Sequence, residues 1–153
     1  MLRISRLTDY GTVVLGHLAG DAAKLSSAAE VAATTGLGLP TVSKLLKSLA
    51  KADLVVSTRG AQGGYKLSRD PDLISAADVI DALEGPVSIT ECSAIDSHCD
   101  FESVCNVGNA WQRINVAIRS ALEDISLNDL LLSRSPVPRF EFSGFPVTVE
   151  QKN

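Results

Sequence analysis

Four apolar side chains, Val42, Leu45, Leu46 and Leu49, repeat at the spacing i, i+3, i+4, i+7. This spacing puts all four on one face of an α-helix, so the segment must pack that face against another apolar surface. The opposite face carries only polar and cationic groups, namely Thr41, Lys44, Lys47, Ser48 and Lys51. One segment is therefore required to be both a core helix and an exposed polar surface.

A second, shorter helix is expected directly before it. Ser27 and Glu30 have capping-box spacing at the start of an alanine-rich stretch, and Gly36 ends that stretch before GLGLP. Two short helices joined by a tight glycine-containing turn, with cations on the free face of the second, indicate a helix-turn-helix. The alternative is a lysine face that only meets solvent.

A β-hairpin is expected after this helix pair. The segments LVVSTR (54–59) and YKLSR (65–69) are strand-like, and the intervening GAQGG supplies the glycines that tight turns require. A hairpin in this position is a wing, and Arg59 at its tip suits the electronegative minor groove of DNA. The alternative is that the hairpin is an ordinary edge of the fold.

The charge distribution is uneven along the chain. The net charge of −4 argues weakly against a nucleic-acid partner. Residues 40–69, however, carry six cations against Asp53 alone, a local net charge of +5, whereas 91–102 carry four carboxylates and neither Lys nor Arg. The cations of the first stretch are Lys44, Lys47, Lys51, Arg59, Lys66 and Arg69.

Size and composition fit one domain with an appendage. The 153 residues can bury a core without disulfides, the N-terminus lacks a clean signal-peptide core, and no run approaches the roughly 18 apolar residues of a membrane span. We expect a cytoplasmic protein that is not an enzyme. Neither His17 nor His98 lies in a nucleophile motif, and there is no phosphate-cradling glycine loop.

The remaining helices are predicted from periodicity and caps. The first spans Leu7 to Leu18. Another starts at the capping pair Ser75 and Asp78 and stops at Gly85. A coiled-coil seam suggests pairing with a second copy, with packing on the first helix as the alternative. Its members are Val107, Trp111, Ile114, Ile118, Ala121 and Ile125. Ser126 and Asp129 cap a short final helix, and a loose tail is expected from Ser133.

All three cysteines, Cys92, Cys99 and Cys105, lie in one acidic loop, separated by six and five residues. Structural zinc usually needs knuckles of two to four intervening residues, whereas an iron–sulfur cluster tolerates longer spans. On spacing alone we rank a cluster above zinc, and zinc above free thiols or a thiol redox switch. His98 is either an additional ligand or an exposed side chain.

Over residues 2–132 the sequence resembles the winged-helix iron–sulfur regulators that include IscR and NsrR. The resemblance rests on LRISRLTDYG, GLGLPTVSKLLKSLAKADLV, the wing RGAQGGYKL, the three-cysteine loop and NAWQRI, and the opening is most similar to regulators of the Suf system. It implies a mainly α fold with a small β-hairpin wing: a winged helix-turn-helix plus a long C-terminal dimerisation helix. It also implies a homodimeric transcription regulator, a repressor of iron–sulfur assembly genes, that senses through a 2Fe-2S or 4Fe-4S cluster.

By position, the resemblance makes Cys92, Cys99 and Cys105 the cluster ligands, although the first gap is one residue longer than in IscR. IscR-like members place a histidine three residues after the last cysteine, where this chain has Gly108. NsrR-like members use a first-helix aspartate from the other subunit, and Asp9 matches it. The alternative is that Asp9 only favours the helix start.

We expect the start of the recognition helix to enter the major groove, and the wing the minor groove, of a palindromic operator. Lys47 and Lys51 are expected at phosphates. The full set is Thr41, Ser43, Lys44, Lys47, Lys51, Arg59 and Gly60. The alternatives are a winged-helix regulator that uses zinc or thiol oxidation, and an iron–sulfur carrier that does not bind DNA.

The expected organisation has four parts. Residues 1–85 form the DNA-binding domain and 86–106 the cluster-binding loop, 107–132 hold the dimerisation helix and the short capping helix, and 133–153 are a flexible tail. No membrane partner is expected.

Overall fold

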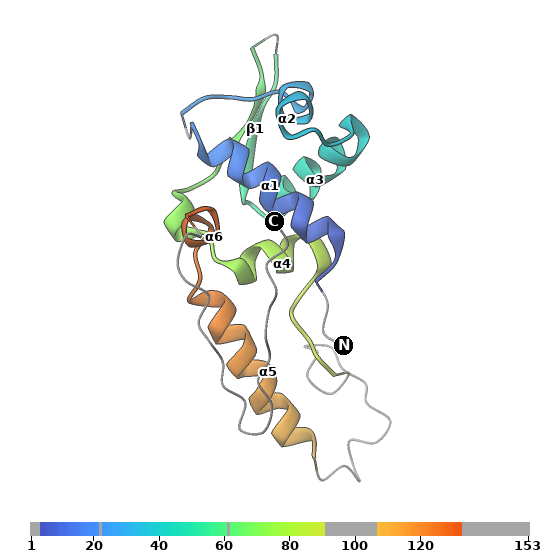
Figure 1. Cartoon of the computed structure of the whole chain (residues 1–153), viewed down its shortest axis with the longest axis vertical. Coiled ribbons are helices and arrows are strands. Elements are labelled where there is room, and N and C mark those ends of the chain that lie inside the picture. The colour runs from blue at the N-terminus through green and yellow to red at the C-terminus, as the bar shows by residue number, and fades with distance from the viewer. Residues whose placement is uncertain (1–3, 22, 61, 91–106, 133–153) are drawn as a thin grey trace, which may run out of the picture.

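The computed structural model describes residues 4–21, 23–60, 62–90 and 107–132. Within these ranges the chain is mainly helical with one two-stranded antiparallel sheet, which confirms the expected fold class (Figure 1). In order, the elements are α1 (Arg6–Ala19), α2 (Ala28–Thr35), α3 (Leu39–Lys51), β1 (Val55–Thr58), β2 (Gly64–Leu67), the 3₁₀ turn η1 (Pro71–Leu73), α4 (Ala76–Glu84), α5 (Gly108–Glu123) and α6 (Leu127–Leu131).

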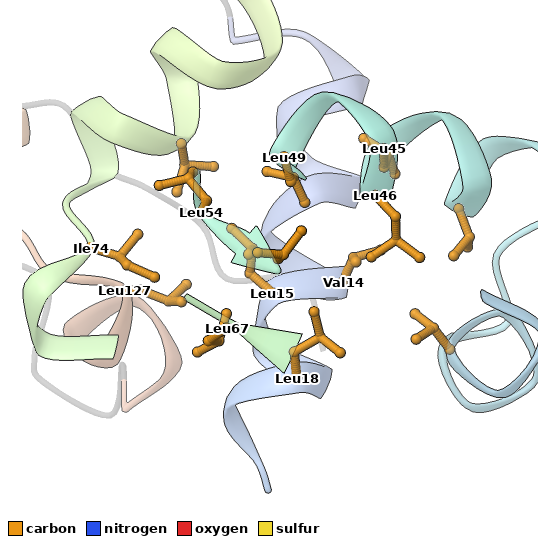
Figure 2. Close-up of a cluster of buried hydrophobic side chains, with 14 residues drawn as sticks. Val14, Leu15, Leu18, Leu45, Leu46, Leu49, Leu54, Leu67, Ile74 and Leu127 are labelled. Carbon is orange, nitrogen blue, oxygen red and sulfur yellow. The ribbon is translucent and has the colours of Figure 1, made fainter. Parts of the chain in front are cut away.

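The core forms where α3 meets α1. Val42, Leu45, Leu46 and Leu49 are all fully buried, as the spacing requires. Figure 2 shows leucines of α3 facing apolar side chains of α1, with Leu67 of the hairpin, Ile74 after η1 and Leu127 of α6 completing the cluster. Burying each such side chain contributes about 1.5–3 kcal/mol, so this contact fixes the orientation of α3.

The helix starts follow the expected caps. Ser27 and Glu30 form a full capping box on α2, in which Glu30 Oε2 accepts from the Ser27 N–H at 2.7 Å. Ser75 with Asp78 does the same for α4, and Ser126 with Asp129 for α6. Each box satisfies amides that a helix start otherwise leaves without an acceptor.

The hairpin pairs Val55 with Leu67 and Thr58 with Gly64. A further backbone bridge joins β2 to the residue before α2: Ser26 N–H donates to Tyr65 O at 2.9 Å, and Tyr65 N–H donates to Ser26 O at 2.8 Å. Gly64 permits this approach, because a Cβ there would lie 2.9 Å from the carbonyl carbon and oxygen of Ser26. The hairpin is therefore fastened to the helix pair.

Helix α5 runs away from the helix-and-hairpin body (Figure 1) and packs mainly against α4. It ends at Glu123, two residues before the expected end of the seam. The reason is tertiary: Ile125 O accepts from Ala76 N–H at 2.8 Å and Leu127 N–H donates to Ile74 O at 2.7 Å. No helix in the described ranges is long and apolar enough to cross a membrane.

We predict that Gly64→Ala lowers the free energy of unfolding by about 1–3 kcal/mol, because the new methyl group must displace the Ser26 backbone. Urea denaturation measures the change. Gly20→Ala is the matched control: Gly20 has φ −61°, and its nearest Cβ contact would be 3.4 Å. A loss of stability in Gly64→Ala no larger than in Gly20→Ala would contradict this account of the junction.

Candidate nucleic-acid interface

The face of α3 that points away from the core is polar and accessible. Lys44, Lys47 and Lys51 are exposed, while Thr41 and Ser43 near the helix start are half-buried. Because the four apolar residues of α3 face inward, the three lysines must project outward. The structure thus gathers all five expected α3 residues on the outer side of one helix.

The first turn of α3 differs from those of α2, α4 and α6. Its N-cap residue is Gly38, no side chain caps its amides, and its first turn contains no acidic residue. The positive end of the helix dipole and the lysines therefore add to one another instead of being neutralised locally. This electrostatic arrangement favours an anionic partner.

The tip of the hairpin is the second accessible cationic feature. Arg59 and Gly60 are exposed directly after β1. Gly60 has φ +115°, a conformation that side chains disfavour, and its carbonyl accepts from Gly63 N–H at 2.9 Å. Gly63 leaves room for Thr58 O, which would lie 2.2 Å from a Cβ. The glycines of GAQGG therefore shape the turn that presents Arg59.

A short turn joins α3 directly to the hairpin. Asp53 adopts φ +57°, the left-handed region, and Leu54 N–H donates to Leu49 O at 2.9 Å. This turn ties the hairpin to α3 and the Ser26 bridge ties it to the start of α2, and Figure 1 shows α3 and the hairpin at the end of the molecule opposite α5. The two expected DNA-reading elements thus have a fixed mutual geometry.

The expected metal site is only partly visible. Cys92, Cys99, Cys105 and His98 lie outside the described residues. Asp9 is exposed in the first turn of α1, beside the exposed Tyr10 and Val13. The described ranges contain no group of three or more His, Cys, Asp or Glu residues placed to hold a metal ion. By donor chemistry, three thiolates and one accessible carboxylate fit an iron–sulfur cluster with one exchangeable ligand.

The model of one protein family matches residues 4–133, and that family is described as an iron-dependent transcriptional regulator. The chain belongs to the Rrf2 family. With the regulator CymR of Bacillus subtilis it shares 34% identity, over 84% of this chain and 89% of that protein. With IscR of Aliivibrio salmonicida it shares 34% identity, over 68% of this chain and 61% of that protein.

Solved Rrf2-type structures have the same architecture. The structure of CymR, described as the global cysteine regulator of B. subtilis, covers 86% of this chain and 97% of its own with a TM-score of 0.65. The structure of T. potens IscR is 29% identical and covers 93% of this chain and 95% of its own with a TM-score of 0.63. Relatives named as transcriptional regulators confirm the expectation that the protein is not an enzyme.

One cation of the basic stretch has a structural role in this Rrf2 chain. Arg69 donates to Leu73 O at 2.9 Å, to Asp53 O at 3.3 Å and to Asp78 Oδ2 at 3.1 Å. It braces the turn between α3 and β1 against α4 instead of facing a partner. The sequence counts Arg69 with the other cations and gives no signal of this role.

Glu84 is a further residue that the sequence did not indicate. From the end of α4 its Oε1 accepts from Ser5 N–H at 3.0 Å and from the Thr8 hydroxyl, so it stabilises the start of α1 from another helix. The hydrogen bond from Thr8, aided by Ser5, holds the pKa of Glu84 below its usual value. Glu84 thereby positions the turn that carries Asp9.

We predict that Glu84→Gln lowers the free energy of unfolding by about 1 kcal/mol near pH 7, because the amide oxygen still accepts from Ser5 and Thr8 but lacks the charge that strengthens both bonds. Because folding lowers the pKa of Glu84, its stabilisation is present above the unfolded-state pKa and disappears as the pH falls through the folded-state value. Urea denaturation from pH 7 to pH 3 should show the difference between the two proteins shrinking as the pH falls below the unfolded-state pKa of a glutamate, about 4.3. Asp21→Asn, at an exposed site, is the control; a difference independent of pH would contradict the assignment.

Proposed function

We propose that two copies of this chain form a cytoplasmic DNA-binding repressor of iron–sulfur assembly genes, regulated by a cluster on the three-cysteine loop. One observation carries the DNA-binding part. Helix α3, whose lysines are exposed, and the hairpin, whose tip residue Arg59 is exposed, lie at the end of the molecule opposite α5 (Figure 1). Membership of the Rrf2 family, which comprises transcriptional regulators, supports it.

In this proposal α3 enters the major groove. Thr41, Ser43 and Lys44 on its first turns face base edges, because recognition helices read DNA with their N-terminal part. Lys47 and Lys51, one and two turns further along, meet phosphates. Arg59 and Gly60 place the wing at the minor groove, where a narrow groove concentrates negative potential.

The surface of α5 supports a homodimer. Trp111 is 41% exposed and Ile114 is 44% exposed, although both lie on the expected seam. Exposed apolar side chains on one helix face favour association with another apolar surface, and a symmetric pair satisfies that need for both copies. Two recognition helices would then meet two half-sites of a palindrome.

For the cluster, Cys92, Cys99 and Cys105 would hold a 2Fe-2S or 4Fe-4S group, and Asp9 of the second copy would complete its coordination. The support is that Asp9 is exposed beside the apolar side chains Tyr10 and Val13, a surface that a second copy can cover. When bound, such a cluster supplies redox- and ligand-sensitive iron chemistry. A carboxylate ligand makes one iron more readily exchanged, which suits a sensor.

The second candidate is a DNA-binding regulator that responds through zinc or the thiols themselves. The 34% identity with CymR, described as a cysteine regulator, favours it, since that identity extends over 84% of this chain. Both candidates share the α3 and wing interface and differ only in what the cysteine loop binds. In a carrier without DNA binding, the exposed lysine face of α3 would instead contact a protein partner.

We predict that Arg59→Ala weakens binding to a duplex from the protein's own promoter by about 1–3 kcal/mol, roughly five- to 150-fold in Kd. Lys47→Ala should reduce the salt dependence of binding by about one counterion. Fluorescence anisotropy from 50 to 300 mM salt measures both. Arg113→Ala, an exposed arginine on α5, is the charge-matched control. Unchanged affinity in Arg59→Ala would show that the hairpin is not a DNA-contacting wing.

We predict that anaerobically purified protein is brown, contains iron and sulfide, and loses its colour in Cys99→Ser, because the cluster loses a thiolate ligand. Asp9→Asn should retain colour on purification but lose it faster to a chelator, whereas Asp21→Asn should behave as the parent. Absorption spectra with iron and sulfide assays measure this. A colourless protein that contains zinc, or no metal, and still binds its promoter would favour the second candidate.

A further inference from the structure

Asn115 is a buried polar residue in the middle of α5, where only 9% of its surface is exposed. A buried amide is costly unless both its donor and its acceptor are used. Here both are used, and neither bond is local. Asn115 Nδ2 donates to Val87 O at 3.1 Å, and Asn115 Oδ1 accepts from Ile89 N–H at 3.2 Å.

The side-chain amide of Asn115 pairs with the backbone of residues 87–89 in the way that a neighbouring β-strand would. Val87 and Ile89 are separated by one residue, so an extended chain presents the carbonyl of the first and the amide of the second on the same edge. Asn115 binds this edge with one acceptor and one donor. It therefore fixes both the position and the register of residues 87–89 along α5.

A second pair of contacts braces the same segment from α4. Asp81 Oδ1 accepts from Val87 N–H at 3.3 Å, and both oxygens of Asp81 accept from Arg119, at 3.3 Å and 2.9 Å. Arg119 lies one helical turn after Asn115, so the two side chains share a face of α5. Segment 87–89 is thus held between two helices by hydrogen bonds.

Apolar packing in this region is incomplete among the described residues. An open hollow of about 540 Å³ borders the segment and is lined by residues that include Ile80, Ile89 and Ile118. Because that space lies beside the segment, close hydrophobic contact alone does not fix its register. The hydrogen bonds of Asn115 take over that role.

We infer that Asn115 is the positioning residue that couples the cysteine loop to the dimerisation helix. Ile89 lies three residues before Cys92, and α5 begins three residues after Cys105, so both ends of the loop meet α5. A change of state in the loop can then shift α5, and with it the spacing of the two recognition helices. This coupling rests on the proposed function.

The test compares the parent with Asn115→Ala, and with Ser120→Ala as an exposed control on the same helix. Each protein is prepared cluster-free and reconstituted with ferrous iron and sulfide. The Kd for the promoter duplex is measured in both states, and the ratio of the two values is the coupling. The parent and Ser120→Ala should show a ratio of at least fivefold in either direction. In Asn115→Ala this ratio should lie within twofold of one, while the iron content and the Kd of the cluster-free protein should be unchanged.

Asn115→Asp provides a second variant of nearly the same shape. It keeps the acceptor for Ile89 N–H but loses the donor to Val87 O, so an intermediate ratio is expected. A parental ratio in Asn115→Ala, or in Asn115→Asp should the first not fold, overturns the inference.

A ratio of one in the parent itself would instead sink the proposed cluster sensing. The contact is then judged without any cluster, by hydrogen exchange of the Ile89 amide in the cluster-free chain. Exchange should be at least tenfold faster in Asn115→Ala than in the parent and Ser120→Ala. Equal rates in all three would show that Asn115 does not hold this segment.

Discussion

The packing of the apolar face of α3 against α1 is the contact on which the rest of the molecule depends. It buries Val42, Leu45, Leu46 and Leu49 completely, and this burial alone decides which side of α3 faces outward. The lysines are consequently presented by the core and not by contacts of their own. The same helix therefore supplies the buried apolar stripe and the exposed cationic surface, and the burial of the first determines the direction of the second.

Local rules anticipated much of this fold. The capping boxes at Ser27, Ser75 and Ser126 are visible in sequence because their partners lie three residues away, and the α3 stripe is visible because its period is helical. The hairpin can be predicted because a glycine-rich stretch, typical of a tight turn, lies between two strand-like segments. Each of these signals is complete within a window of about a dozen residues, so no tertiary knowledge is needed to read it.

What the sequence did not indicate depends on distant partners. Glu84 bonds to Ser5, 79 positions away, and Arg69 to the Asp53 carbonyl, 16 positions away. Asn115 is a polar residue among Ile114, Val116 and Ile118, and no local pattern shows that its amide is buried and bonded to residues 87 and 89. The end of α5 at Glu123 is likewise set by backbone bonds to the segment before α4. The predicted residues of α3 and of the hairpin tip lie at accessible positions, and their contact with DNA stays a prediction. The three cysteines lie outside the described residues, so their ligand role stays a prediction.

The bridge between Ser26 and Tyr65 has a consequence for how such a regulator can acquire new targets. It is made of backbone atoms, at the junction where the first helix of the pair, through its cap at Ser27, adjoins the hairpin. Hydrogen bonds between backbone atoms persist when most side chains at other positions are replaced. Residues on the outer side of α3 and at the hairpin tip are therefore free to diverge while the frame that aims them remains constant. If these residues contact DNA as proposed, exchanging a few of them changes the operator that is bound without rebuilding the scaffold.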